Sequence, residues 1–355
     1  MTTGHPSGLR AWARSAYEGV LLWQRRHPRV VVGVFVVVGV VLGVWLGWEA
    51  VQGVSWRATL AALGGFSALH GIGAVACFLA NNFLRSTAWY ILFPQRAPPV
   101  WRLFLVENTG IGVNNLLPMR WFSEAVQFAI LRVRDQVPEG IALATLGMTR
   151  VLDFQANFLL LAVSMPLVPG VREHVAMGPV LGVAFFLAAG STLGLHGLGW
   201  AYRRFPRFRR LPVVAGVGEA VLALEERPRR LVVALVLTLG QWTALGGAAW
   251  FLAQGVDIDI SLAGAVALVI LVTFSATTIP GLLGGLGVFE FASVGLLVTF
   301  FGVEKSVALS CGLLMHALWW LPPVLIALVM LPLEGWGALQ MVRRGPLPGT
   351  HNAPP

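Results

Sequence analysis

The fold of this chain depends on an apolar stretch that is broken in the middle and reads Ile279-Pro280-Gly281-Leu282-Leu283-Gly284-Gly285-Leu286-Gly287-Val288-Phe289-Glu290. A second break reads Asn114-Asn115-Leu116-Leu117-Pro118-Met119-Arg120, with Ser123 and Glu124 just beyond it. Hydrocarbon offers no hydrogen bonds to a bare backbone, so non-helical chain at membrane depth persists only inside protein or beside a watery cavity. Paired breaks in the two halves of such a chain therefore predict a binding site near the bilayer midplane.

The composition indicates a membrane protein. The 355 residues are 57% hydrophobic and 12% charged, with a mean hydropathy of +0.76. A soluble chain would normally carry about a quarter charged residues. Several stretches of about 20 apolar residues predict a polytopic, all-α membrane protein. The first stretch, 30–48, is too long for a signal-peptide core and precedes no cleavage pattern, so we expect it to be a retained span.

Net charge is +9, and nearly every base is an arginine. These arginines lie in loops between apolar spans, where they orient the protein and contact anionic lipid headgroups, so we expect no nucleic-acid partner. Cys77 and Cys311 lie in apolar segments without CxxC spacing and predict neither a disulfide nor a metal site.

The arginines also predict the topology, because cytoplasmic loops are rich in them. Five lie in residues 1–29 and eight in residues 201–230, so we expect both segments to be cytoplasmic. Both ends of 103–131 are basic, which predicts a re-entrant hairpin from the cytoplasm, whereas 262–301 would enter from outside. Together they give inverted-repeat-like halves with both termini inside. The six full spans would be 30–48, 60–93, 140–165, 176–200, 231–253 and 306–333.

One alternative topology and three regions complete this interpretation. If each hairpin instead crossed the membrane twice, there would be ten spans with the same loop sides. The regions are a cytoplasmic N-terminal segment (1–29), a transmembrane domain (30–335) and a cytoplasmic, disordered tail (336–355).

Charged residues inside spans are energetically costly and indicate function. Arg120 and Glu124 are four residues apart, and Arg150 and Asp153 are three apart, so each pair shares a helix face. Each pair could be a local salt bridge. Alternatively, the two arginines form a cationic pocket for a phosphate, since a guanidinium binds oxygen pairs with two parallel hydrogen bonds. The predicted headgroup site comprises Asn114, Asn115, Arg120, Glu124, Arg150 and Asp153. Glu107, Arg85 and His316 are further ionisable residues in apolar segments, where a charge costs free energy.

Glu290 has no nearby base in the sequence, so its partner must come from another part of the fold. It is either a proton-coupling residue or a cap on the helix that starts after Gly287. The glycine run itself either forms a break or allows close helix packing, and packing is the preferred interpretation for Gly39, Gly43 and Gly47. Lone His70 and His316 are better explained as helix–helix hydrogen-bond partners than as metal ligands. The predicted gating or proton-coupling set is Pro118, Pro280, Gly284, Gly285, Gly287 and Glu290.

Catalytic motifs are not recognisable in the sequence. We find no Ser/His/Asp arrangement, no GxSxG, no HExxH and no GxxxxGK, and the basic loop 201–230 is too short for a catalytic domain. We therefore expect no enzymatic activity, no metal and no cofactor.

In these motifs the chain resembles the flippase-like membrane family that includes the transmembrane region of lysylphosphatidylglycerol synthases. The family's N-x-L-L-P-x-R segment is matched around Pro118 and Arg120, its Arg-x-x-Asp by Arg150 and Asp153, and its P-G-G-L-G-V-x-E by residues 284–290. The chain departs from the family at three positions, where Leu283 replaces a usual Pro, Ser123 a usual Gly, and Gln127 a common Arg.

The resemblance implies translocation of an aminoacylated phospholipid or a similar anionic or polyprenyl lipid. We therefore expect a lipid flippase of the inner (plasma) membrane that binds a phosphate-bearing headgroup, with phospholipids or polyprenyl lipids as partners. A second hypothesis is a non-transporting protein that presents lipid to a separate lipid-modifying enzyme, a synthase or glycosyltransferase. A third is an integral enzyme that acts through Glu124, Asp153 or Glu290.

Overall fold

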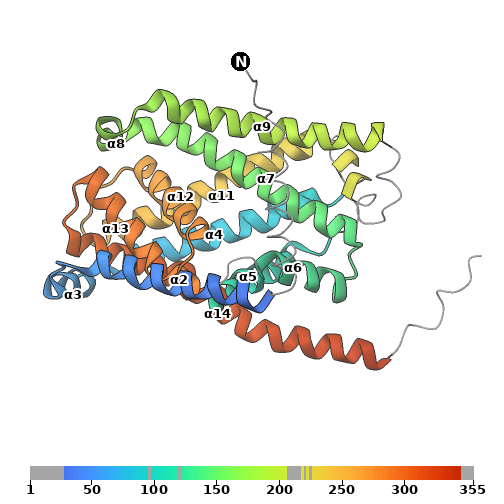
Figure 1. The fold of residues 1–355 in the computed structure, drawn as a ribbon, viewed down its shortest axis with the longest axis horizontal. Coiled ribbons are helices and arrows are strands. Elements are labelled where there is room, and N and C mark those ends of the chain that lie inside the picture. Colours follow the sequence, from blue (N-terminus) through green and yellow to red (C-terminus); the bar gives the residue numbers. More distant parts are fainter. Residues whose placement is uncertain are drawn as a thin grey trace, which may run out of the picture.

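The computed structural model describes residues 28–94, 97–117, 122–205, 217–219, 221–223 and 226–344. Every regular element within these ranges is helical (Figure 1). The elements are α2 (Pro28–Val51), α3 (Trp56–Gly64), α4 (Ala68–Leu92), α5 (Val100–Leu116), α6 (Phe122–Val133), α7 (Glu139–Ser164), η1 (Met165–Leu167), α8 (Pro169–His174), α9 (Met177–Arg204), α11 (Pro228–Gln254), α12 (Leu262–Thr278), η3 (Leu283–Gly285), α13 (Val288–Phe301) and α14 (Lys305–Arg344).

Four helical segments of the described chain are long and apolar enough to cross a membrane. A fifth candidate is the pair α2 and α3, which is bent by 83°. The chain is therefore a multi-pass helical membrane protein. The four segments are Glu139–Leu167, Pro228–Gln254, Leu283–Phe301 and Lys305–Gly335.

Two of the predicted boundaries are wrong. The span predicted over 60–93 is divided into α3 and α4, because Gly64 and Gly65 favour a helix end and Gly65 is the C-cap of α3. The tail predicted to be disordered from 336 is helical as far as Arg344. Its Ala, Leu, Gln, Met and Arg residues favour helix, and the next Pro is Pro346.

The first predicted break separates α5 from α6. Helix α5 ends at Leu116 and α6 begins at Phe122, and the two helices pack against each other as a hairpin. Pro118 and Arg120, two of the predicted site residues, lie outside the described residues.

The second predicted break separates α12 from α13 and contains the short helix η3. Gly284, Gly285 and Gly287 have φ angles of 67°, 84° and 86°. These angles lie in the left-handed region, which glycine adopts far more readily than residues with a Cβ. The glycines are therefore required by the backbone path itself.

Helix α2 packs directly on this second break. A Cβ on Gly39 would lie 2.9 Å from the Gly281 carbonyl oxygen, and one on Gly43 would lie 2.6 Å from the Leu282 nitrogen. A Cβ on Gly47 would lie 3.3 Å from the Gly287 Cα. The packing interpretation of this glycine stripe is confirmed, since only glycine lets the two backbones approach so closely.

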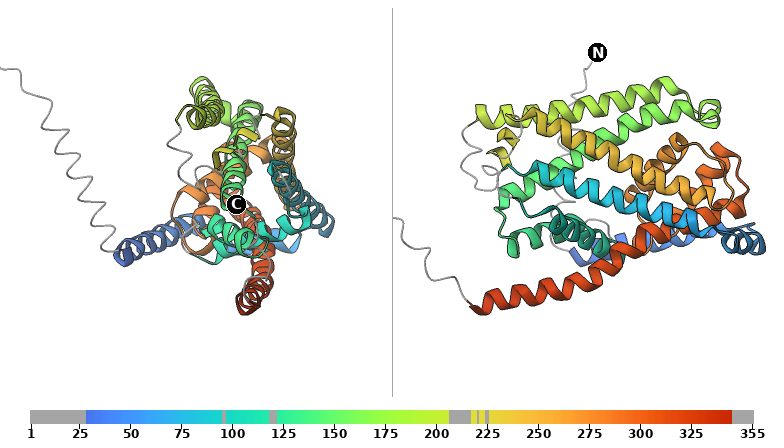
Figure 2. Two further views of the ribbon diagram at one scale, coloured as in Figure 1. Left: turned by 90° about the vertical axis from the view of Figure 1, so that its right-hand side faces the viewer. Right: turned by 180° about the vertical axis from the view of Figure 1, so that it is seen from behind.

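The two hairpins lie toward opposite ends of the molecule. In Figure 1 α5 and α6 lie toward the right-hand end, and α12 and α13 toward the left. Helices α4 and α11 pack along each other between them, and Figure 2 shows the same neighbourhood from behind. Helix α5 packs on α14, and α12 packs on α7. Each hairpin therefore rests on the long helix that follows the other one.

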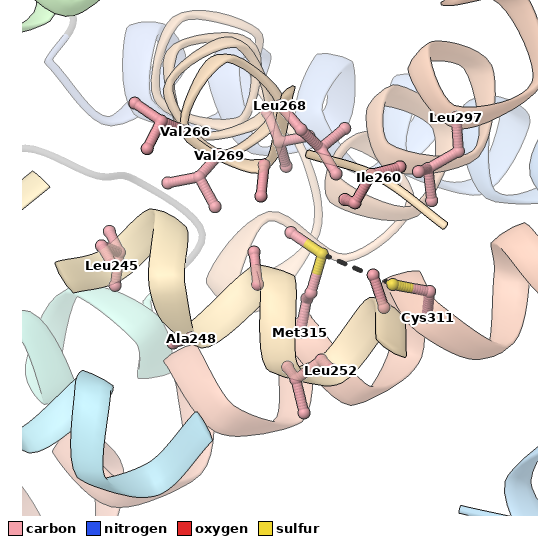
Figure 3. Packing of buried hydrophobic residues seen from close by; sticks show 14 of the residues in the cluster. Leu245, Ala248, Leu252, Ile260, Val266, Leu268, Val269, Leu297, Cys311 and Met315 are labelled. Atoms are coloured by element: carbon pink, nitrogen blue, oxygen red, sulfur yellow. Dashed lines mark hydrogen bonds between the residues drawn. The ribbon is translucent and has the colours of Figure 1, made fainter. Parts of the chain in front are cut away.

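The largest apolar core joins α11 to α12, α13 and α14. Figure 3 shows Leu245 and Leu252 of α11 in this cluster with Val266 of α12, and all three are buried. The Cys311 Sγ lies 4.0 Å from the Met315 Sδ, and both side chains are fully buried. Cys311 and Cys77 are free thiols.

A cluster of ion pairs connects the first hairpin to the C-terminal part of α14. The Arg102 Nε donates to Asp135 at 2.9 Å, and its Nη1 donates to Glu334 at 2.5 Å. Burial raises the pKa of the Asp135 carboxyl, and the Arg102 guanidinium opposes that rise. At the opposite end the Lys305 Nζ donates to the carbonyl oxygens of Glu49 and Gln52, at 2.9 and 2.7 Å, and joins α14 to the end of α2.

The close contact between α2 and the second break can be tested with a pair of glycine variants. We expect Gly43→Ala to lower the free energy of unfolding by about 1–3 kcal/mol, because the added methyl group meets the backbone of Leu282. Gly33→Ala in the same helix is the matched control, since a Cβ there has no atom within 4 Å. Thermal unfolding in detergent measures both; equal melting temperatures would contradict the packing described here.

Candidate functional site

A cavity of about 390 Å³ lies where the two hairpins meet. Residues of α4, α5, α6, α7, α11, α12, α13 and α14, together with Gly284 of η3, form its wall. Its size falls within the range of about 300–1,000 Å³ that is usual for small-molecule sites.

The two breaks touch each other beside this cavity. The Trp320 Nε1 of α14 donates to the carbonyl oxygen of Asn115, at the end of α5, over 3.3 Å. A Cβ on Gly284 would collide with the Trp320 ring and would lie 3.2 Å from the same Asn115 oxygen. Residues beside both breaks therefore border one cavity.

The carboxylate of Asp153 in α7 accepts hydrogen bonds from four side chains in the cavity wall. Its Oδ1 accepts from Gln241 Nε2 at 3.2 Å and from Trp242 Nε1 at 3.0 Å. Its Oδ2 accepts from Arg85 Nη2 and Arg150 Nη1, both at 3.4 Å. Only 8% of Asp153 is exposed, so one carboxylate ties together α4, α7 and α11.

Arg150 also forms an ion pair with Glu124 of α6. Their side chains are 37% and 40% exposed, which places the pair at the mouth of the cavity. From its spacing, Glu124 was expected to share a face with Arg120, which lies outside the described residues. In the fold its partner comes from α7.

Arg85 and Glu107 form a fourth ion pair of this cluster, and neither residue belongs to the predicted headgroup site. Arg85 lies between Glu107 and Asp153, and Ser86 Oγ donates to Glu107 Oε2 at 3.5 Å. The sequence did mark both residues as costly charges in apolar segments. It gave no signal that they pair, because 22 residues separate them and they lie on different helices.

The described charges of this cluster are two arginines and three carboxylates, so the carboxylates outnumber the arginines by one. Arg85 and Arg150 face the carboxylates of Glu107, Glu124 and Asp153, so within the described chain each of these arginines already has a partner. Arg120, the other arginine of the predicted cationic pocket, lies outside the described residues.

Asparagine amides line the part of the cavity next to these charges. Five of them border it, and the Oδ1 atoms of Asn114 and Asn157 are buried without a hydrogen-bond partner in the described structure. Such atoms are available to accept hydrogen bonds from a hydroxyl or an ammonium group. The five residues are Asn81, Asn82, Asn114, Asn115 and Asn157.

Glu290 acts as a helix cap and also has a partner from another helix. Its Oε2 accepts from the Gly287 backbone N–H at 2.7 Å, at the start of α13. Its Oε1 lies 2.5 Å from the Nδ1 of His316 on α14. The capping interpretation is confirmed, as is the expectation of a partner from elsewhere in the fold. His316 borders the cavity and stacks on Phe289, with 4.5 Å between ring centroids.

The other described members of the predicted gating or proton-coupling set lie at different distances from the cavity. Gly284 borders the cavity, whereas Pro280, Gly285 and Gly287 shape the backbone behind it. Groups of three or more His, Cys, Asp or Glu residues suited to a metal ion do not occur among the described residues.

The role of Asp153 can be tested by removing its charge. We expect Asp153→Asn to destabilise the protein by about 3 kcal/mol, because Arg85 and Arg150 would both lose the buried carboxylate that they contact. Glu139→Gln is the control, since Glu139 forms a half-exposed pair with Arg132 and its loss should cost less than about 1 kcal/mol. Chemical or thermal unfolding in detergent distinguishes the two; similar losses would show that Asp153 does not link the helices.

Comparison with known families identifies one family model that matches the chain. A family model described as the lysylphosphatidylglycerol synthase TM region matches residues 34–327. A comparison with curated proteins finds no match. Because the match covers most of the chain and includes both breaks, the protein belongs to the family of the lysylphosphatidylglycerol synthase transmembrane region.

Proposed function

We propose that this protein translocates a phosphate-bearing lipid across the cell's inner (plasma) membrane, with the headgroup passing through the cavity. The observation that carries the proposal is a cavity at the junction of two broken hairpins, with the Arg150–Glu124 pair at its mouth. Aminoacylated and polyprenyl-linked lipids are candidate substrates.

The length of α6 favours a re-entrant topology for the first hairpin. Helix α6 has 12 residues, so at about 1.5 Å per residue it is roughly 18 Å long. The hydrocarbon core of a bilayer is about 30 Å thick. In the proposed topology α5 and α6 enter from the cytoplasm, α12 and α13 enter from outside, and six full spans place both termini in the cytoplasm.

The cavity offers separate surfaces to the two parts of a lipid. Arg150 can exchange its partner Glu124 for a phosphate, because the pair is partly exposed and both groups present charges to the opening. The free Oδ1 atoms of Asn114 and Asn157 suit hydroxyl or amine donors on the headgroup. Phe154 and Phe274, about half exposed at the same opening, can face acyl chains that remain in the bilayer.

Leaflet exchange in reconstituted liposomes tests this function. With a panel of labelled phospholipids and a polyprenyl phosphate, we expect the wild-type protein to exchange at least one lipid class faster than protein-free liposomes. Arg150→Gln should reduce that rate on the order of tenfold, because a charge-assisted contact to the phosphate is lost.

Arg132→Gln is the matched control, since Arg132 lies outside the cavity in an exposed pair with Glu139. It should exchange lipid like wild type. If wild type matches protein-free liposomes for every lipid class, the transport proposal is wrong.

The family description favours a second candidate function. It names the transmembrane region of a synthase, so this protein could present lipid to a separate lipid-modifying enzyme without moving it between leaflets. A stoichiometric enzyme that co-purifies with the protein, together with the absence of leaflet exchange, would support this candidate over transport.

A further inference from the structure

The cavity wall is built from two sets of residues at matching helix positions. Helices α5 and α12 precede the two breaks, and each has 17 residues. Three of the five cavity-lining residues of α12 occupy the same positions, counted from the helix start, as the three of α5, and Ile270 and Phe274 have no lining counterpart. The matched pairs are Ile111 and Thr273, Asn114 and Ala276, and Asn115 and Thr277.

Helices α7 and α14, which follow the two hairpins, repeat the same correspondence. Arg150 is the twelfth residue of α7, and His316 is the twelfth of α14. Asp153 likewise matches Trp319, and Phe154 matches Trp320; all six residues line the cavity.

The ion pairs also involve residues at matching helix positions. Glu124 is the third residue of α6, and Glu290 is the third of α13. Each glutamate pairs with the basic residue 26 positions later, Arg150 in one case and His316 in the other. The segments α4–α7 and α11–α14 are therefore two structural repeats, and their hairpins lie toward opposite ends of the molecule (Figure 1).

Exposure distinguishes the two repeats at these matched positions. Glu124 and Arg150 are 40% and 37% exposed at the side chain, whereas Glu290 and His316 are 8% and 7% exposed. Thr277 is exposed, and its counterpart Asn115 is buried. The mouth between α6, α7 and α12 is therefore open, and the matching place between α13, α14 and α5 is closed.

Two contacts between α5 and α14 help to close this second position, where α2 also packs on α13. The Trp320 Nε1 donates to the Asn115 carbonyl oxygen. Gly112 of α5 lies against the carbonyl oxygen of Pro323 on α14, so close that a Cβ would collide with it. Helix α5 accordingly packs on α14 more extensively than α12 packs on α7.

We propose that the protein has a second cavity mouth, between α5, α13 and α14, which opens when the mouth between α6, α7 and α12 closes. The two repeats exchange conformations, so in the other state Glu290 and His316 are exposed and Glu124 and Arg150 are buried. This inference rests on the proposed function, because it gives a phosphate-bearing lipid an exit toward the opposite leaflet. Trp320 is then a positioning residue that holds the second mouth closed.

Thiol labelling at matched positions tests the exchange without requiring transport. Thr277→Cys reports on the open mouth and Asn115→Cys on the closed one, and the latter keeps the carbonyl oxygen that Trp320 binds. Cys77→Ala provides the background, and the fully buried Cys311 is retained. In nanodiscs we expect a small maleimide to label Thr277→Cys much faster than Asn115→Cys.

Trp320→Phe should change the two rates in opposite directions. Loss of the indole N–H removes one hydrogen bond from the closed mouth, so we expect labelling of Asn115→Cys to rise about two- to tenfold and labelling of Thr277→Cys to fall. Gly112→Ala should act in the same way by separating α5 from α14, and Gly147→Ala is its control, since a Cβ there has no atom within 4 Å.

A rise at Asn115→Cys without a fall at Thr277→Cys would show local loosening and overturn the exchange, as would unchanged rates at both positions. Failure of the proposed function has a different signature. In that case the labelling rates would still change in opposite directions, while liposomes would show no leaflet exchange for any lipid.

Discussion

The whole structure depends on one constraint, which is that backbone polar groups cannot be left without partners where the chain leaves the helix inside a membrane. Around the second break, Glu290 accepts the Gly287 N–H, and Leu282 N donates to the Leu286 carbonyl oxygen at 3.3 Å. The glycine stripe of α2 covers the same break at backbone contact distance. Near the first, Trp320 satisfies the Asn115 carbonyl oxygen. The breaks therefore exist only because other helices surround them.

The charges in the cavity wall obey a related rule. A buried charge is tolerated when it is paired and hydrogen-bonded, and here Asp153 receives donors from three helices. The Arg85–Glu107 pair extends this network to α5. The network joins α4 to α11, the helices that begin the two repeats. It therefore connects the two repeats, and the proposed transport would change how these repeats are arranged relative to each other. The partly exposed Arg150–Glu124 pair is the member that a headgroup can reach most directly.

Family membership, the cavity and the repeats contribute different parts of the functional argument. The family places the protein among membrane regions associated with lipid chemistry. The cavity supplies space, paired charges and free amide oxygens for a headgroup. The matched positions of Glu124 and Glu290 supply two related mouths, of which one is open. Together these features favour movement of a lipid between leaflets over simple anchoring.

The sequence alone determined the helical membrane class, the positions of both breaks and the charges that cost energy, since these follow from local composition and from backbone chemistry. The span prediction overlooked the division between α3 and α4 at Gly64 and Gly65, and it ended α14 earlier than the structure does. It could not assign Arg150 to Glu124, Arg85 to Glu107 or His316 to Glu290. Spacing rules describe neighbours on one helix, whereas these partners lie more than 20 residues apart and meet only when separate helices pack. The tertiary structure alone therefore decided which charges on different helices pair and which mouth of the cavity is open, whereas the Arg150–Asp153 pair within α7 follows from its spacing.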